Sequence, residues 1–195
     1  VQLNCDRDQG GFGCGHHHVL RPSWDFLGQD YIHVLVTAGN SCPHFRLASS
    51  GSYDIAYGRW MLTGQTAAYD ATSSVHFEEY NRKTWSFNLV DVGGRGFNRS
   101  SHQYTTFLRS VERDDYRGFH MDLTRTLPNP DNDGSPIVEA TYREIGQLSD
   151  RFVCVFDRVI AMDGDDEKVV NLHSYAVDPP MLIDGSWDGG VVENA

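Results

Sequence analysis

Three consecutive histidines, His16, His17 and His18, form the most evident reactive cluster of the sequence. Successive residues of a strand point to opposite faces, so His16 and His18 are expected to share one face. An imidazole titrates near neutral pH and can act as a general base beside a second hydrogen-bond donor. The competing interpretation is a solvated loop of glycine and histidine, with at most incidental affinity for divalent metals.

Two further groups suggest ligands. Residues 129–134 (NPDNDG) resemble the start of a calcium loop, but Ala140 stands where the bidentate acid should be and Glu139 is one residue short. An ordinary acidic turn is the alternative. Four arginines form either a local basic patch for a carboxylated sugar or a scattered set on a solvated face: Arg109, Arg113, Arg117 and Arg125.

Size and charge narrow the class of protein. The 195 residues fit one domain, and a net charge of -11 argues against nucleic acid and anionic membrane surfaces as partners. No run approaches the roughly 20 apolar residues of a membrane helix. The chain opens on Val1 without an initiator methionine or signal peptide. We therefore expect residues 1–195 to form a single domain of a larger protein or assembly, processed or fragmentary at its ends.

The four cysteines are compatible with two disulfides: Cys5, Cys14, Cys42 and Cys154. Four cysteines allow three pairings, and disulfides indicate a secreted, periplasmic or extracellular protein. Cys154 lies in the apolar run 152–156, so a free buried thiol is the alternative for that residue. The sequence has no C-x-x-C pair, which argues against a zinc ribbon.

The element pattern is that of a β protein. Apolar and polar residues alternate in 119–123 and in 138–143, where Val138, Ala140 and Tyr142 form the apolar set. Further strands are expected at 31–36, 85–90, 107–111, 152–160 and 169–175. The only helix expected is one or two turns within 73–83, capped by Ser73 or Ser74. The acidic turn 162–166 is expected to join the last two strands as a hairpin. These signals predict an all-β, antiparallel β-sandwich with at most short helices.

Several segments, in order, resemble the β-sandwich domain of heparinase II/III-like polysaccharide lyases. GCGHHHVLRPSW (13–24) is similar to the family's G-x-H-x-H-x-D-x-x-S-F, and TWSFNLVD (84–91) to its T-x-A-H-N-T-V-x-V-D. MDLT (121–124) and ATYR (140–143) follow in the family's order. FVCVFDRV (152–159) and KVVNLHS (168–174) then match V-F-D-R-V and L-L-H-S/T. The resemblance implies a lyase-type super-sandwich and spans most of the chain.

The resemblance also implies an activity. These lyases cleave uronic-acid polysaccharides by β-elimination in a cleft between an α/α toroid and this sandwich. The uronate carboxylate is neutralised, a base removes the C5 proton, and an acid protonates the leaving oxygen. An acidic polysaccharide or other glycan is thus the expected partner. A toroid domain or chain is a second expected partner, and self-association through exposed strand edges is a third.

Site residues carry over one by one. His16 falls at the family's catalytic histidine and His18 at a metal-binding histidine, whereas Leu20 replaces the aspartate that follows. In the same segment His17 and Arg21 are predicted to bind substrate.

Other positions depart from the family. Residues 37–39 (TAG) stand where D-x-G would be, and Phe87 replaces the histidine of H-N-T. Ser41 occupies the place of the family tyrosine, for which Tyr53 or Tyr57 is the expected substitute. One histidine alone cannot hold a structural zinc, so a divalent metal, zinc or calcium, is expected only if other ligands contribute. His173 is expected to be a structural residue at a strand end.

Two functions follow. The first is the sandwich part of a polysaccharide lyase that acts on uronic-acid polysaccharide by β-elimination. The alternative is a non-catalytic extracellular module for carbohydrate binding or assembly, favoured by the missing metal ligands and the missing toroid.

Overall fold

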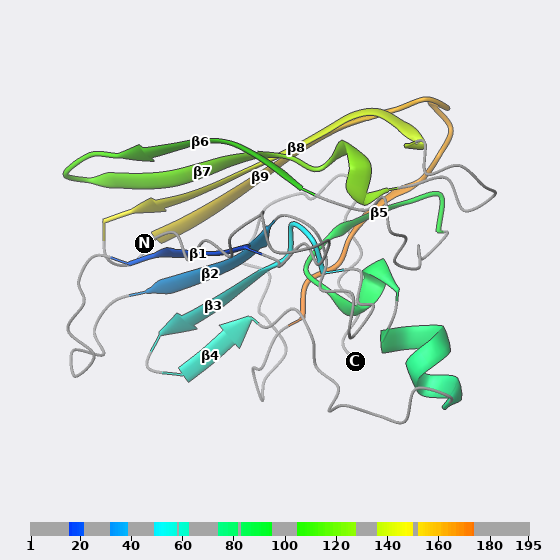
Figure 1. Ribbon diagram of the computed structural model, residues 1–195, viewed down its shortest axis with the longest axis horizontal. Coiled ribbons are helices and arrows are strands. Elements are labelled where there is room, and N and C mark those ends of the chain that lie inside the picture. Colours follow the sequence, from blue (N-terminus) through cyan, green and yellow to red (C-terminus); the bar gives the residue numbers. More distant parts are fainter. Residues whose placement is uncertain are drawn as a thin grey trace, which may run out of the picture.

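Two four-stranded antiparallel sheets lie face to face in the computed structural model (Figure 1). The structure describes residues 16–21, 32–38, 49–57, 59–62, 74–81, 83–94, 105–127, 136–149 and 152–173. The first sheet has the order β1 (His16–Leu20), β2 (His33–Ala38), β3 (Tyr53–Tyr57) and β4 (Arg59–Leu62). The second has the order β6 (Thr106–Glu112), β7 (Tyr116–Asp122), β8 (Val138–Leu148) and β9 (Phe152–Ala161).

Short elements complete the described part of the chain. A two-stranded sheet pairs β5 (Val90–Val92) with β10 (Lys168–Val170), and three brief helical turns are η1 (Phe77–Asn81), η2 (Thr84–Ser86) and η3 (Thr124–Thr126). The prediction of an all-β antiparallel sandwich with short helices is confirmed. No helix among the described residues is long and apolar enough to cross a membrane.

The main core lies between the two large sheets. β1, β2 and β3 contribute Leu20, Val34, Val36, Ala38, Tyr53 and Ile55, and the facing sheet contributes Phe119, Met121 and Ile145. A second core under the β5–β10 sheet joins Val90 and Val92 to Val138. Burial of these apolar faces at about 25 cal/mol per Å² provides most of the drive to fold the sandwich.

The alternation in β7 is confirmed, but the face predicted for β8 is wrong. Met121 is 0% exposed, as expected. In β8 a register shift between Val138 and Ala140 inserts one residue opposite β9. Because a strand has a two-residue period, this bulge turns every later side chain over. Arg143, Ile145 and Gln147 therefore face the core, and Tyr142 lies on the outer side.

Three other local predictions need correction. Trp85 lies in the 3-10 turn η2 and not in a strand, since strand pairing begins only at Val90. The acidic turn 162–166 follows β9, but β10 pairs with β5, so no β9–β10 hairpin forms. The last strand of the described residues, β10, ends at Val170, and residues 171–173 after it are irregular.

The expected helix is present as one short turn. η1 spans Phe77–Asn81 and has π-helical geometry. The Ser74 hydroxyl accepts a hydrogen bond from the backbone N–H of Phe77 at 3.0 Å, which confirms Ser74 as the capping residue.

Cys154 is a free thiol on the exposed side of β9. It is therefore neither buried nor paired, and a framework of two disulfides, which needs all four cysteines, is not supported. The other three cysteines lie outside the described residues. The calcium-like segment 129–134 lies outside them as well.

Candidate functional site

The predicted histidines lie on β1, at the edge of its sheet. Antiparallel pairing sets His16 opposite Ala38 and His18 opposite Val36 on β2. The three histidines thus lie on a strand, as a shared face for His16 and His18 requires, while their side chains lie outside the described residues. Their catalytic, binding and metal roles stay predictions.

Arg21 follows β1 directly and lies near His33 at the start of β2. Burial lowers the pKa of His33 below 6.5, and the positive charge of Arg21 lowers it further. His33 is therefore neutral at pH 7. The Arg21 cation and the neutral His33 imidazole therefore lie together at this end of the first sheet. The sequence predicted only Arg21 as a substrate-binding residue here.

Tyr53 and Tyr57, both on β3, have different environments. Tyr53 is 4% exposed, whereas Tyr57 is 40% exposed. On β2, His33 pairs with Ala56, the neighbour of Tyr57 on β3. His16 of β1 pairs with Ala38, which lies five residues further along β2. At ~3.3 Å per residue the rows of Tyr57 and His16 are at least ~17 Å apart along the strands. The structure therefore does not bring Tyr57 beside His16.

Tyr53 covers a buried arginine that sequence reasoning placed on the solvent side. Its ring centroid lies 5.1 Å from the Arg143 guanidinium carbon, and Arg143 is 0% exposed. Burial raises the pKa of the Tyr53 phenol above 10, the nearby Arg143 charge opposes that rise, and Asp157 adds to it. A buried, protonated phenol over a cation suits packing, and it has no open path to a polymer.

Arg143 joins three segments of the chain. Its Nε and Nη2 donate to the two Asp157 carboxylate oxygens at 2.7 and 2.8 Å. Its Nη1 donates to the carbonyls of Gly51 and Asn88 at 2.8 and 2.7 Å. Burial alone would lower the Arg143 pKa, but the charge and hydrogen bonds of Asp157 outweigh burial and raise it. Gly51 accepts one of these bonds from a left-handed turn (φ +89°) that favours glycine.

A second polar cluster gathers a histidine and a tyrosine around Asn88. The Tyr80 hydroxyl on η1 lies 3.3 Å from His173 Nε2. Asn88 Oδ1 accepts from the backbone N–H of His173 at 2.7 Å and lies 3.3 Å from its Nδ1. Asn88 is 1% exposed, and its Nδ2 donates to the Tyr53 carbonyl at 2.7 Å. The buried amide therefore orients His173 and ties it to the sheet.

The imidazole of this cluster is suited to proton transfer. Burial lowers the pKa of His173 below 6.5, and its hydrogen bond to the Trp85 backbone opposes that shift. His173 is accordingly neutral at pH 7 and can accept a proton, with Tyr80 as its hydrogen-bonded neighbour. Both side chains are half-buried, and the His76 ring stacks on Tyr80 at 5.3 Å. The sequence predicted that His173 is a structural residue, and its hydrogen bonds to Asn88 agree with that prediction. Its Nε2 nevertheless lies beside the Tyr80 hydroxyl.

The donors for a metal are incomplete in the described part of the chain. No group of three or more His, Cys, Asp or Glu side chains comes together there. Phe87, at one expected ligand position, is 3% exposed and packs with Leu89. Thr37, at the position of the aspartate in D-x-G, carries a hydroxyl in place of a carboxylate. Neither the apolar Phe87 nor the hydroxyl of Thr37 fits the zinc site of the family that the sequence resembles.

Comparisons with known proteins identify a related fold. No family model matches the sequence, and no curated protein matches it. Among solved structures, heparinase III superimposes with a TM-score of 0.51 and 13% sequence identity. The match covers 75% of this chain and 20% of the heparinase III chain, so this chain corresponds to about one fifth of that protein's length. A distant structural relationship to heparinase III is thereby shown, at the level of the fold.

Proposed function

We propose that this chain is the β-sandwich portion of a polysaccharide lyase that acts on uronic-acid-containing polysaccharide by β-elimination. The observation that carries the proposal is the structural likeness to heparinase III over three quarters of the chain. The order of the matching sequence segments is an independent feature that supports the same class.

β-Elimination requires one base and one acid close to a neutralised carboxylate. The base removes the C5 proton, the electron pair forms the C4–C5 double bond, and the C4–O bond breaks as the leaving oxygen gains a proton. Among the described residues, His173 and Tyr80, 3.3 Å apart, are a neutral base with a hydrogen-bonded phenol. We assign proton transfer to this pair and keep His16 as a second candidate for the base or for carboxylate neutralisation.

The remaining predicted roles divide by accessibility. His17 and Arg21 stay proposed contacts to the polymer, and Tyr57, exposed at the end of β3, stays a proposed contributor. Tyr53 serves to cover Arg143, so we give it no contact with substrate. The proposed reaction uses no metal, because the buried apolar Phe87 stands at one expected ligand position and Thr37 stands at the position of the aspartate ligand.

A helical domain is the proposed partner of the sandwich. In the family that the sequence resembles, a toroid forms the other wall of the cleft, and this chain matches one fifth of heparinase III. We propose an α/α toroid on the same protein or on another chain, outside the cell or in the periplasm.

The second candidate is a non-catalytic carbohydrate-binding or assembly module. A specific observation favours it: Leu20 and Phe87, which replace an acid and a histidine of the family pattern, are 4% and 3% exposed. Such positions cannot regain ligand chemistry without opening the core.

An elimination assay separates the two functions. The full-length protein is mixed with uronic-acid polysaccharides, and the ultraviolet absorbance of the new C4–C5 double bond is followed. The lyase proposal predicts a signal that falls by at least about 100-fold in His173→Gln, because general base catalysis contributes about 10²–10⁴-fold. His16→Ala is measured in parallel. Absence of signal on every polymer, with folded protein, would favour the binding module.

A further inference from the structure

We propose that the outer face of the β6–β9 sheet is a binding platform for an oligosaccharide that carries carboxylates, centred on Tyr116 and Phe156. The platform lies on the far side of this sheet from the main core, away from the His173–Tyr80 pair. Its ligand class, a uronic-acid glycan, rests on the proposed function.

Two glycines form the floor of the platform. A Cβ atom added at Gly118 would lie 2.5 Å from the Tyr116 hydroxyl oxygen, and one added at Gly146 would lie 2.6 Å from Tyr116 Cε2. The Tyr116 ring therefore lies across both glycines, where any other residue would displace it. Its hydroxyl donates to Glu144 Oε1 at 3.0 Å, which fixes the ring further. A ring held in advance loses little conformational entropy when a ligand stacks on it.

A row of ligand-binding side chains crosses the sheet beside that ring. Strand pairing aligns Phe156 with Glu144, Glu144 with His120, and His120 with Arg109. The row spans four strands, or ~14 Å at ~4.8 Å per strand. It therefore combines an aromatic ring that is 66% exposed, a carboxylate acceptor, an imidazole and a guanidinium. A sugar has apolar ring faces, which pack on aromatic side chains, and hydroxyls, which bind polar side chains. This row therefore suits an oligosaccharide.

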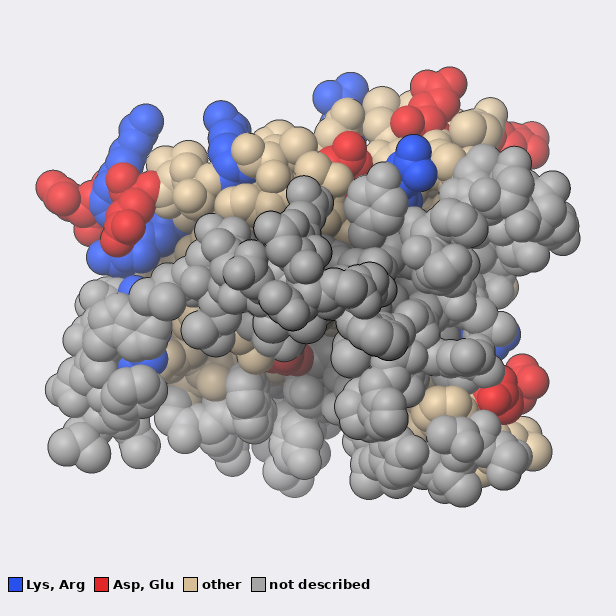
Figure 2. Space-filling model, viewed as in Figure 1, with Lys and Arg blue, Asp and Glu red and all other residues tan. Residues whose placement is uncertain are grey.

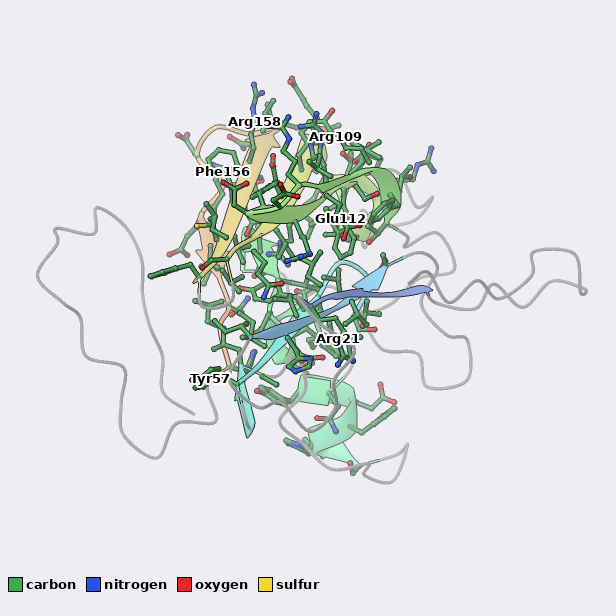
Figure 3. All side chains as sticks on the ribbon, turned by 90° about the vertical axis from the view of Figure 1, so that its left-hand side faces the viewer. Arg21, Tyr57, Arg109, Glu112, Phe156 and Arg158 are labelled. Carbon is green, nitrogen blue, oxygen red and sulfur yellow. The ribbon has the colours of Figure 1, made fainter. Side chains whose placement is uncertain are left out.

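Two cations favour a carboxylated ligand. Arg109 on β6 and Arg158 on β9 project outward from this sheet, on the side away from the β1–β4 sheet, with Phe156 near them (Figure 3). Figure 2 shows basic and acidic side chains interleaved along this layer, at the top of the view. Guanidinium groups recognise carboxylates through paired hydrogen bonds, so the chain, although net -11, presents local complementarity to uronates.

The charges at the centre of the row also weigh against a second copy of the chain as the occupant. Cores of protein interfaces are depleted of charged residues. Here Glu144, His120 and Arg109 occupy successive positions of the row. A hydrated glycan satisfies such groups with hydroxyls and carboxylates, whereas a protein face would bury them.

Calorimetric titration of the full-length protein with alginate oligosaccharides tests the platform, with neutral dextran as the control ligand. Tyr116→Ala removes the ring, and Gly146→Ala keeps it but displaces it. Each is expected to weaken alginate binding about tenfold, the loss of roughly one stacking contact. Arg158→Gln is expected to weaken it about fivefold, more strongly at low salt.

Two variants serve as matched controls. Lys168→Gln removes an exposed charge from β10, and Val75→Ala removes an apolar side chain that is 78% exposed just before η1, outside the β6–β9 sheet. Binding within about twofold of wild type in both, with the losses above, supports the platform. Absence of binding by the wild type, or binding by Tyr116→Ala and Gly146→Ala as tight as that of the wild type, overturns it. A dimer that dissociates in both Phe152→Ala and Phe156→Ala also overturns it, in favour of a second copy.

The elimination assay, run on the same proteins, keeps the two proposals apart. Alginate binding that requires Tyr116 while no polymer is cleaved overturns the lyase function and supports the platform. Cleavage by the wild type with binding unchanged in the platform variants overturns the platform alone.

Discussion

The inner face of the β6–β9 sheet holds an arginine with no exposed surface, whereas its outer face carries Arg109 and Arg158 in solvent (Figure 3). Arg143 has a bidentate carboxylate and two backbone carbonyls as partners. Its guanidinium is fully occupied, so it contributes structure. The outer arginines keep donors for a ligand, and this difference separates the residues that build the sandwich from those that we propose to bind glycan.

The same contrast applies to aromatic residues. Tyr53 lies over Arg143 in the core, and Tyr116 lies over two glycines on the outer surface. Both rings are held by their surroundings, but only Tyr116 is partly exposed. Residue type alone therefore does not distinguish a packing tyrosine from one available to a ligand.

Arg143→Met is expected to produce the largest loss of stability. The variant leaves the Asp157 carboxylate, whose side chain is 13% exposed, without its partner. Removing one member of a buried pair costs about 3–5 kcal/mol. Chemical denaturation of wild type and variant measures the difference. Arg158→Met, one residue beyond Asp157 but on the outer face, should change stability by less than about 0.5 kcal/mol. Equal effects of the two substitutions would remove the distinction between the faces.

Asn88→Ala is expected to have the next largest effect. It removes the donor to the Tyr53 carbonyl and the acceptor for the His173 N–H, both at 2.7 Å. Buried groups left without partners cost about 1–3 kcal/mol. The control is Asn171→Ala, whose amide makes a longer bond of 3.3 Å to the Leu89 carbonyl. A loss in the control as large as in Asn88→Ala would contradict a special role for Asn88.

Ser74→Ala tests the cap of η1, which positions Tyr80. Losing the bond to the Phe77 N–H should reduce the free energy of unfolding by about 0.5–1 kcal/mol, because a capping side chain contributes roughly that much. Ser74→Asp, which preserves a capping oxygen, should retain most of the stability. If both variants unfold at the wild-type denaturant concentration, the cap is dispensable.

The smallest expected effect concerns pH. The pKa of His173 is lower in the folded protein than its usual 6.5, so the unfolded chain takes up a proton first as pH falls. This group therefore reduces stability progressively as pH falls below about 6.5, and the loss is complete below its folded pKa. His173→Gln should flatten that part of the stability profile. Denaturation of the wild type and the variant at several pH values between 7.5 and 5 measures the difference. His33, whose pKa is also lowered, is expected to contribute to the slope that remains in the variant.

The sequence predicts the sandwich well where alternation is regular, as in β7, whose core residues Phe119 and Met121 are both buried. It fails at β8 because one extra residue near Glu139 reverses the strand's faces, and no composition signal marks that bulge. The exposure of Phe152 and Phe156 was also not predicted, since an apolar run does not show which face is covered.

The candidate sites were harder to predict for a different reason. Tyr80 and His173 are separated by 93 positions in the sequence, and Arg143 and Asn88 by 55. Only the fold brings such pairs together. The matched segments did contain Asn88, Arg143, Asp157 and His173, but the pattern marked them as family positions without showing their contacts.

The most direct test of the lyase proposal counts two products of one reaction. Full-length protein is incubated with a uronic-acid polysaccharide, and new reducing ends and new C4–C5 double bonds are measured in the same sample. β-Elimination predicts one double bond for each new reducing end. Reducing ends without double bonds would indicate hydrolysis and contradict the proposal. The absence of both products on every polymer tested would also contradict it and would favour a binding module.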